Sequence, residues 1–261
     1  MWHIIRAVLL LIPTFLVDLF GWIFKYSNHP EKYPIELRYR KTRRLILRVC
    51  HYLRLDMKVE GLENIPQETC CFYCNHLAAV DPLLFIAALE TPTTFVAKKE
   101  IEEMPVVGRI FTGINGLFLN RSDLKQQLRV MMKVEDSLKN KTCNWVIYPE
   151  GTRNKDPMNK LIDFHKGTFR PAMKANVPLV PVVSYGTFRA LNLKHNYKKY
   201  PTLIKFLTPI YPEEYQGKTT DEMASLIQSR IQKEVSYYAK PLDHKRMIES
   251  KDKYYRFNKV K

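Results

Sequence analysis

A histidine and an aspartate five positions apart follow an apolar run, and together they could form a general base. The run at residues 71–74 is predicted to be a short buried strand, and it stops at Asn75, directly before His76. Asp81-Pro82 is typical of a helix start. On a strand-to-helix loop the two side chains can face each other, so that the carboxylate fixes the imidazole tautomer and stabilises its protonated form. N-capping alone would also explain Asp81, and a histidine in this position is often only structural.

Further polar side chains follow other predicted strands. They are Arg121, Glu150, Gly151, Thr152 and Arg153. The carboxyl ends of parallel strands form the ligand crevices of α/β sheets, so these residues could line the same crevice as His76. Arginine suits bidentate phosphate contact, and Gly151 and Thr152 could lend backbone N–H groups to the same anion. The pattern predicts an enzyme that deprotonates a hydroxyl group on a phosphorylated substrate, although Arg121 or Glu150 alone could be an ordinary surface or loop residue.

Alternating predicted strands and helices would position these side chains. Strands are expected at residues 58–61, 69–74, 93–97, 116–121, 144–148, 177–183 and 203–207. The first two are expected to pair around a turn at residues 64–66, and Pro181 predicts a bulge or an edge position for its strand. Helices are expected from Asp81, from Ser122 and from a capping box that begins at Thr219. This order indicates an α/β fold with a mixed sheet flanked by helices.

The helix expected after Ser122 is rich in apolar residues. Its predicted buried residues are Leu124, Leu128, Met131, Met132, Val134 and Leu138. We therefore expect this helix to cover one face of the sheet.

Composition points to anionic partners and a reducing compartment. The chain has 261 residues and a net charge of +16, which suits nucleic acid, anionic lipid or phosphorylated small molecules. Five cysteines do not form an even disulfide framework. Cys71 and Cys74 form a CxxC motif near His76, but residues three apart on a strand face opposite ways and a complete zinc ligand set is missing. We expect buried cysteines and no metal.

The most apolar stretch, residues 7–24, is predicted to attach the chain to a membrane. As one helix it would be about 27 Å long, slightly short of a bilayer core. Pro13 and Gly21 could kink it, and Asp18 would be costly at mid-membrane. A basic block follows, formed by Arg38, Arg40, Lys41, Arg43, Arg44 and Arg48. This block favours the cytoplasmic face of a cell membrane if the segment spans, or contact with anionic head groups if it inserts in one leaflet. A core helix packed on the main domain is the alternative.

These patterns divide the chain into three regions. Residues 1–54 are expected to form a membrane-associating helical arm, residues 55–240 the catalytic domain, and residues 241–261 a basic tail with little periodicity.

Four sequence blocks resemble the PlsC-type glycerolipid acyltransferases. Residues 75–81 match the NHxxxxD motif, residues 116–121 match a strand ending in arginine, residues 148–153 are similar to FPEGTR, and residues 177–182 match VPxxPV. All four occur in the family's order, and Tyr148 stands where the family has Phe. The resemblance implies a glycerol-3-phosphate acyltransferase-like fold.

The resemblance also implies a reaction. His76, oriented by Asp81, would take the proton from the 2-hydroxyl of 1-acyl-sn-glycerol 3-phosphate (lysophosphatidic acid). The oxygen would then attack the thioester of acyl-CoA or acyl-carrier protein and give phosphatidic acid, without a cofactor. Arg121 and Arg153 would hold the acceptor phosphate with Lys98, which lies in a run similar to the family's VAK, while Glu150 and Gly151 would shape the site.

Two alternatives stay open at this point. The same fold could acylate glycerol 3-phosphate or another lysophospholipid. The high positive charge would also fit a non-enzymatic protein that binds membrane or nucleic acid, although no nucleic-acid motif is visible and no nucleic-acid partner is expected.

Overall fold

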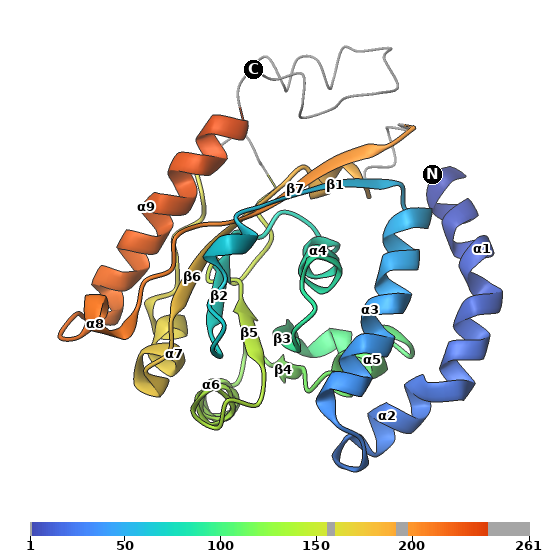
Figure 1. Cartoon of the computed structure of the whole chain (residues 1–261), viewed down its shortest axis with the longest axis horizontal. Helices are drawn as coiled ribbons and strands as arrows, with labels where there is room; N and C mark the ends of the chain where they lie inside the picture. The colour runs from blue at the N-terminus through green and yellow to red at the C-terminus, as the bar shows by residue number, and fades with distance from the viewer. Residues whose placement is uncertain (1, 156–159, 192–197, 240–261) are drawn as a thin grey trace.

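The computed structural model describes residues 2–155, 160–191 and 198–239 of the chain (Figure 1). The predicted basic tail at residues 241–261 lies outside these ranges. The described residues form one central sheet with helices on both of its faces, and an N-terminal helical arm packs at one side (Figure 1).

A seven-stranded sheet runs through the described part of the chain in the order β1-β7-β6-β2-β5-β3-β4. The strands are β1 (Leu55–Glu60), β2 (Cys71–Cys74), β3 (Thr93–Lys98), β4 (Leu117–Leu119), β5 (Asn144–Ile147), β6 (Leu179–Tyr185) and β7 (Tyr200–Phe206). Neighbouring strands are parallel except for β6 and β7, which pair antiparallel. The prediction of an α/β fold with a mixed sheet is confirmed.

Helices connect and cover these strands. The α-helices are α1 (Trp2–Asp18), α2 (Phe24–Asn28), α3 (Ile35–Tyr52), α4 (Asp81–Ala88), α5 (Val107–Gly113), α6 (Leu124–Lys139), α7 (Arg170–Ala175), α8 (Pro212–Tyr215) and α9 (Thr220–Tyr238). Short helical turns are η1 (Leu19–Ile23), η2 (Pro30–Lys32), η3 (Leu62–Asn64), η4 (Lys99–Ile101), η5 (Lys166–Phe169) and η6 (Thr187–Arg189). Thr219 and Glu222 form the predicted capping box at the start of α9.

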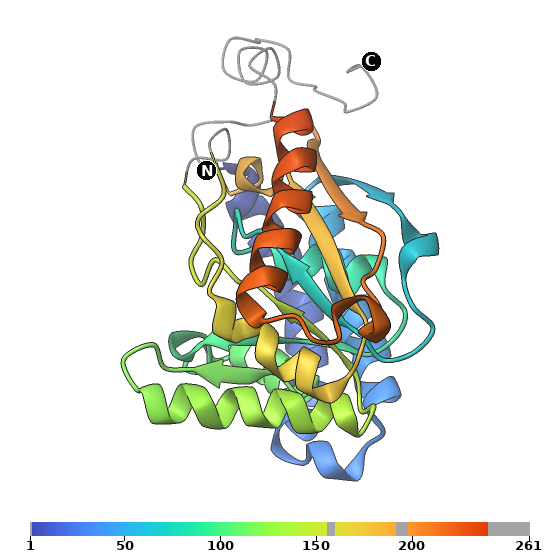
Figure 2. The ribbon, with the colours of Figure 1, turned by 90° about the vertical axis from the view of Figure 1, so that its left-hand side faces the viewer.

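Alternate side chains of β2 face opposite layers of helices. Cys71 and Tyr73 belong to the core beneath α6, α7 and α9, whereas Phe72 and Cys74 belong to the core beneath α3 and α4. Figures 1 and 2 show these two layers on either side of the sheet. The two cysteines of the CxxC motif therefore lie on opposite faces of the sheet and cannot share a metal ion or a disulfide.

The predicted pairing of the first two strands is wrong. β1 pairs in parallel with β7, and β2 lies between β5 and β6. The turn after β1 therefore leads to a strand three positions away, beyond β7 and β6. Side-chain periodicity predicts that a segment is a strand, but it does not identify the partner.

Pro181 lies in an interior strand, so an edge position is wrong and a bulge is correct. β6 pairs with β2 on one side and β7 on the other. The β7 ladder ends at the pair Val182–Phe206, and the next bridge, Leu179–Ile210, is shifted by one residue. Regular pairing with β7 ends next to Pro181, whose carbonyl still accepts from the Leu207 N–H at 2.9 Å.

Helix α6 is predicted correctly in position but not in the direction of its apolar residues. Val130, Val134 and Leu138 are buried against the sheet. Leu124, Leu128 and Met132 are exposed instead. The helix carries apolar residues on two sides, and the sheet covers only one of them.

The N-terminal arm packs on the catalytic domain through an ion pair at Asp18 and through buried apolar side chains. The Asp18 carboxylate accepts from Arg48 of α3 at 2.7 Å and from the Trp22 indole at 2.8 Å. Trp22, Ile23 and Tyr26 are buried against α3 and α5. The chain bends at the π-helical turn η1, which contains Gly21, as predicted. Within the described residues, no helix combines the length and the apolar character that crossing a bilayer requires.

Part of the predicted basic block stabilises the fold. The Arg38 guanidinium donates to the backbone oxygens of Tyr33 and Gly113, and Arg43 donates to the Ala87 carbonyl. Arg48 pairs with Asp18. Arg38 is buried and so is not available to head groups, whereas the contact of the rest of the block with lipid stays a prediction.

Candidate active site

The predicted histidine–aspartate pair lies where β2 leads into α4. The Nδ1 atom of His76 is 2.7 Å from Oδ2 of Asp81. Asp81 is fully buried, whereas the His76 side chain keeps 19% of its surface exposed. Because Nδ1 faces the carboxylate, it carries the proton, and Nε2 is left with a lone pair.

Five donors converge on the Asp81 carboxylate. Oδ2 accepts from His76 Nδ1 and from the backbone N–H groups of Leu77 and Ala78, at 2.7 and 2.9 Å. Oδ1 accepts from the hydroxyl groups of Ser184, at 3.0 Å, and Thr187, at 2.5 Å. None of these donors is a backbone N–H of α4, so N-capping does not explain Asp81. The bonds compensate for burying the charge.

Ser184 and Thr187 contact Asp81 in the candidate site, and the sequence analysis missed them. β6 runs parallel to β2, so residues at the end of β6 lie at the same edge of the sheet as His76. The Asn75 side chain fixes this register, because its amide exchanges hydrogen bonds with the backbone N–H and carbonyl of Ser184, both at 2.9 Å. The sequence contains a signal that could have identified them. Small polar residues follow the apolar run at residues 177–183, just as Asn75 follows the apolar run at residues 71–74.

Glu150 braces the loop rather than facing an open site. It is buried, with Oε1 accepting from the His76 backbone N–H at 2.7 Å and Oε2 from the Ile162 N–H at 3.0 Å. Burial raises its pKa, and these two hydrogen bonds oppose the rise. The Asn154 N–H also donates to the His76 carbonyl at 2.7 Å. The loop that follows β5 therefore holds the His76 backbone from both sides.

Tyr148 stacks on His76. Their ring centroids are 4.3 Å apart with an interplanar angle of 27°. The Tyr148 hydroxyl is buried and has no hydrogen-bond partner among the described residues. Burial raises the pKa of Tyr148 well above its usual value, and the neighbouring Cys74 and Asp81 side chains add to the rise. The ring restricts the imidazole orientation, whereas the hydroxyl gains no hydrogen bond there.

Gly151 serves the turn, so the expectation that its N–H binds an anion is wrong. That N–H donates to the Tyr148 carbonyl at 3.0 Å. Gly151 has φ of +65°, and a Cβ there would lie 2.9 Å from the His165 ring. Both observations require glycine. Thr152, the next residue, is exposed.

The predicted phosphate ligands lie along the same edge at increasing distances from His76. The Arg153 backbone adjoins Asn154, which contacts His76 directly. Lys98 ends β3, and Arg121 follows β4 at the sheet edge, three strands from β2. Strand spacing places the ends of β2 and β4 about 14 Å apart. The structure thus brings the Arg153 backbone close to the histidine and places Lys98 and Arg121 further along the same edge of the sheet.

The two arginines are exposed, and within the described residues neither side chain forms a hydrogen bond or an ion pair. Lys98 differs because it is ion-paired with Glu100. Lys98 and Arg121 together hold the pKa of Glu100 below its usual value, Lys98 most strongly. Lys98 and Arg121 therefore already share an anionic neighbour, Glu100.

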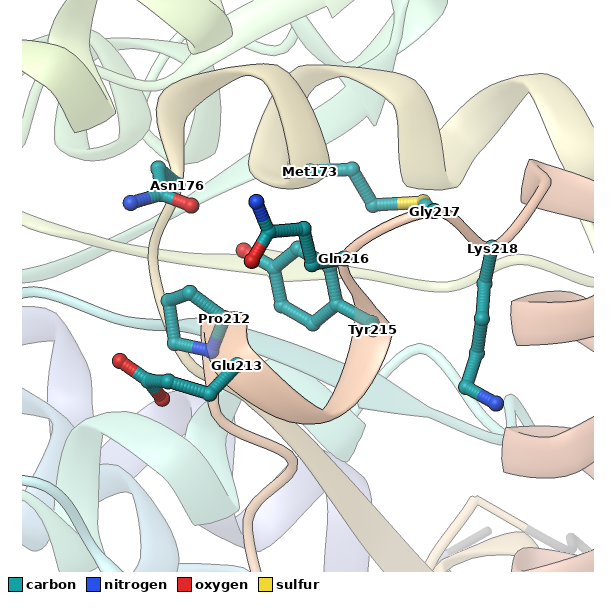
Figure 3. A pocket seen from close by; sticks show the side chains of 8 residues that line it. All are labelled: Met173, Asn176, Pro212, Glu213, Tyr215, Gln216, Gly217 and Lys218. Atoms are coloured by element: carbon teal, nitrogen blue, oxygen red, sulfur yellow. The ribbon is translucent and has the colours of Figure 1, made fainter.

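The pocket in Figure 3 is separate from this site. About 340 Å³ in volume, it lies between α7 and the α8–α9 connection. Its charged side chains, Glu213 and Lys218, point in different directions (Figure 3). It contains neither His76 nor its partners.

The arrangement at the edge of the sheet can remove a proton from a hydroxyl group. Nδ1 of His76 faces Asp81, which accepts five hydrogen bonds, and cations follow along the same edge of the sheet. Within the described residues, no group of three or more His, Cys, Asp or Glu side chains could hold a metal ion.

Comparisons with known proteins find similarity to acyltransferases. A family model described as Acyltransferase matches residues 56–185. A probable 1-acyl-sn-glycerol-3-phosphate acyltransferase of Mycoplasma pneumoniae is 25% identical over 248 residues, which cover 89% of this chain and 92% of that protein. A 1-acyl-sn-glycerol-3-phosphate acyltransferase of Saccharomyces cerevisiae is 29% identical over 71% of this chain and 62% of its own length.

A solved structure has the same fold. The crystal structure of the 1-acyl-sn-glycerophosphate (LPA) acyltransferase PlsC from Thermotoga maritima superposes with a TM-score of 0.71 and 24% identity. The superposition covers 90% of this chain and 97% of that one.

Proposed function

Because this chain belongs to the acyltransferase family, we propose that it acylates the 2-hydroxyl of 1-acyl-sn-glycerol 3-phosphate and produces phosphatidic acid. The acyl donor is a thioester, acyl-CoA or acyl-carrier protein. The observation that carries this proposal is the His76–Asp81 pair at 2.7 Å, held by five donors at the edge of the sheet.

His76 acts as the general base. Its Nε2 takes the proton of the acceptor hydroxyl while the hydroxyl oxygen forms a bond to the thioester carbonyl carbon. The carbon–sulfur bond then breaks, and the imidazolium returns the proton to the leaving thiolate. Asp81 stays ionised throughout, because it stabilises the imidazolium and keeps Nδ1 protonated. A thioester is already activated, so the reaction needs no cofactor and no protein nucleophile.

Three cations bind the acceptor phosphate in this proposal. Arg153 lies on the loop that contacts His76, which suits a phosphate one glycerol length from the reacting hydroxyl. Lys98 and Arg121 follow along the crevice and add positive charge. Glu150 contributes by fixing the His76 backbone, and Thr152 lies exposed beside Arg153.

The arm attaches the chain to the membrane that contains the acceptor, with the catalytic domain on the cytoplasmic face. The support is an exposed apolar side of α1 and η1. The exposed residues are Ile5, Leu9, Leu10, Ile12, Leu16, Val17 and Phe20. Asp18, the one acidic residue of α1 and η1, is paired with Arg48, so residues 2–23 carry no unpaired acid into the interface.

An acyl-transfer assay tests the proposal. The purified chain is given lysophosphatidic acid or glycerol 3-phosphate, each with acyl-CoA and with acyl-carrier protein. We expect phosphatidic acid from lysophosphatidic acid with at least one donor, and little product from glycerol 3-phosphate. Equal or faster acylation of glycerol 3-phosphate would assign the chain to the other acceptor.

A further inference from the structure

Helix α6 has three distinct sides. Val130, Val134 and Leu138 face the sheet core. At about 100° per residue, Leu124, Leu128 and Met132 form a second side, which points away from the core. These three side chains are 70%, 55% and 62% exposed. They follow each other at every fourth position, so they form one continuous apolar stripe about 12 Å long.

Basic residues form the third side of α6. Lys125, Arg129 and Lys133 each directly follow a residue of the apolar stripe, and all three are exposed. Residues 124–133 contain no acidic residue. The acids of α6 come later, and one of them, Glu135, is paired with Lys139. An apolar stripe beside a row of cations is the pattern of a helix that lies on an anionic lipid surface.

The position of α6 connects this surface to the acceptor. The helix begins three residues after Arg121, at the edge of the sheet where the strands end. Figure 2 shows α6 lying along one border of the molecule, with its outer side uncovered. A lipid surface against this side would bring its head groups beside Arg121.

We propose that the outer side of α6, formed by Leu124, Leu128, Met132, Lys125, Arg129 and Lys133, docks on an anionic lipid surface, as a second contact beyond the arm. This proposal rests on the proposed function in one respect, which is that the acceptor is a membrane lipid. Apolar and cationic side chains alternate here at a spacing that suits head groups and acyl chains together. Insertion of even one exposed leucine strengthens partitioning roughly tenfold or more, and each cation adds roughly fivefold.

A fluorescent probe on α6 in the full chain tests the proposal directly. The described cysteines are all buried, so an environment-sensitive fluorophore on Leu128→Cys labels one site. Leu62→Cys is the matched control, because Leu62 is 50% exposed in η3, which precedes β2 and so lies toward the opposite edge of the sheet. Vesicles contain phosphatidylcholine alone or an equimolar mixture with phosphatidylglycerol.

With the mixed vesicles we expect the probe at position 128 to shift to shorter emission wavelength and gain intensity, and salt to reverse part of the change. The probe at position 62 should not respond. If the protein sediments with the vesicles while the probe at 128 still reports water, the proposal is wrong. A response to acyl-carrier protein alone, or to protein concentration without vesicles, would also overturn it by assigning the surface to a protein partner.

Charge variants give a second readout. Lys125→Gln/Arg129→Gln/Lys133→Gln should weaken binding to the mixed vesicles by roughly 10²-fold, about fivefold for each cation. Lys174→Gln/Lys218→Gln/Lys233→Gln removes the same charge from exposed positions on α7, directly before α9 and within α9, and it should have a much smaller effect. Equal losses in both variants would contradict a local contact.

The two proposals fail in different ways. Acyl transfer to a short-chain acceptor dissolved in water should be unchanged in the α6 charge variant. An inserted probe without any acyl transfer would leave the docking surface intact and refute the proposed function. Full acyl transfer with a probe that stays in water would support the proposed function and refute the docking surface.

Discussion

Replacing Asp81 with asparagine removes one charge from the site while keeping its shape. Oδ2 accepts from three N–H groups, so only the amide oxygen can occupy that side. The amide NH₂ then faces the hydroxyl groups of Ser184 and Thr187, which can rotate and accept. We therefore expect Asp81→Asn to fold and to keep the His76 tautomer.

The expected loss in rate follows from the lost charge. At the 2.7 Å separation of Asp81 Oδ2 and His76 Nδ1, two unit charges attract by about 6 kcal/mol at an effective dielectric constant of about 20. An imidazole that is half protonated in the transition state realises about half of this, about 3 kcal/mol. The kcat for acyl transfer should therefore fall about 10²-fold.

The assay compares kcat and the urea midpoint of the parent, Asp81→Asn and Asp81→Ala. The alanine variant leaves five donors without an acceptor in a buried site, at a cost of about 1–3 kcal/mol for each one that water does not reach, so it should unfold far more easily. An asparagine variant that folds and keeps the parent's kcat would refute the assigned role of Asp81. An alanine variant as stable as the parent would show that the carboxylate does not order the loop.

Tyr148→Phe removes a buried hydroxyl group without a partner, so it should raise the free energy of unfolding in urea by up to about 1–2 kcal/mol, and a lower value would contradict this account. Because burial raises the pKa of Glu150, the folded state binds its proton more tightly than the unfolded state. The free energy of unfolding should therefore fall as pH rises from about 4.3 to the raised pKa, and Glu150→Gln should lose this fall while the exposed control Glu63→Gln keeps it. If Lys98 and Arg121 bind the acceptor phosphate as proposed, Glu100 competes with it for these cations, so Glu100→Gln should lower the acceptor KM with kcat unchanged, and a raised KM would exclude this competition.

Local chemistry in the sequence predicts much of the site. The strand at residues 71–74 and the helix start at Asp81 place His76 and Asp81 on one short loop, where they meet at 2.7 Å. The positions of strands and helices follow from side-chain periodicity, and the family resemblance is confirmed. Since the chain is an acyltransferase, the alternative of a non-enzymatic basic protein is wrong.

Contacts between distant segments are what the sequence does not reveal. Ser184 and Thr187 reach Asp81 from more than 100 positions away, through the pairing of β6 with β2. The sequence also does not reveal that β1 pairs with β7, because β7 comes late in the chain. Leu124 looks like a core residue in the sequence, because a helix with two apolar sides does not indicate which side the sheet covers.

The role of His76 is tested most directly by one variant, His76→Ala, assayed for acyl transfer from acyl-CoA or acyl-carrier protein to lysophosphatidic acid. We expect the rate to fall by about 10²- to 10⁴-fold, while the urea midpoint stays near that of the parent. A folded His76→Ala protein that transfers the acyl chain at the parent's rate would show that another group accepts the proton.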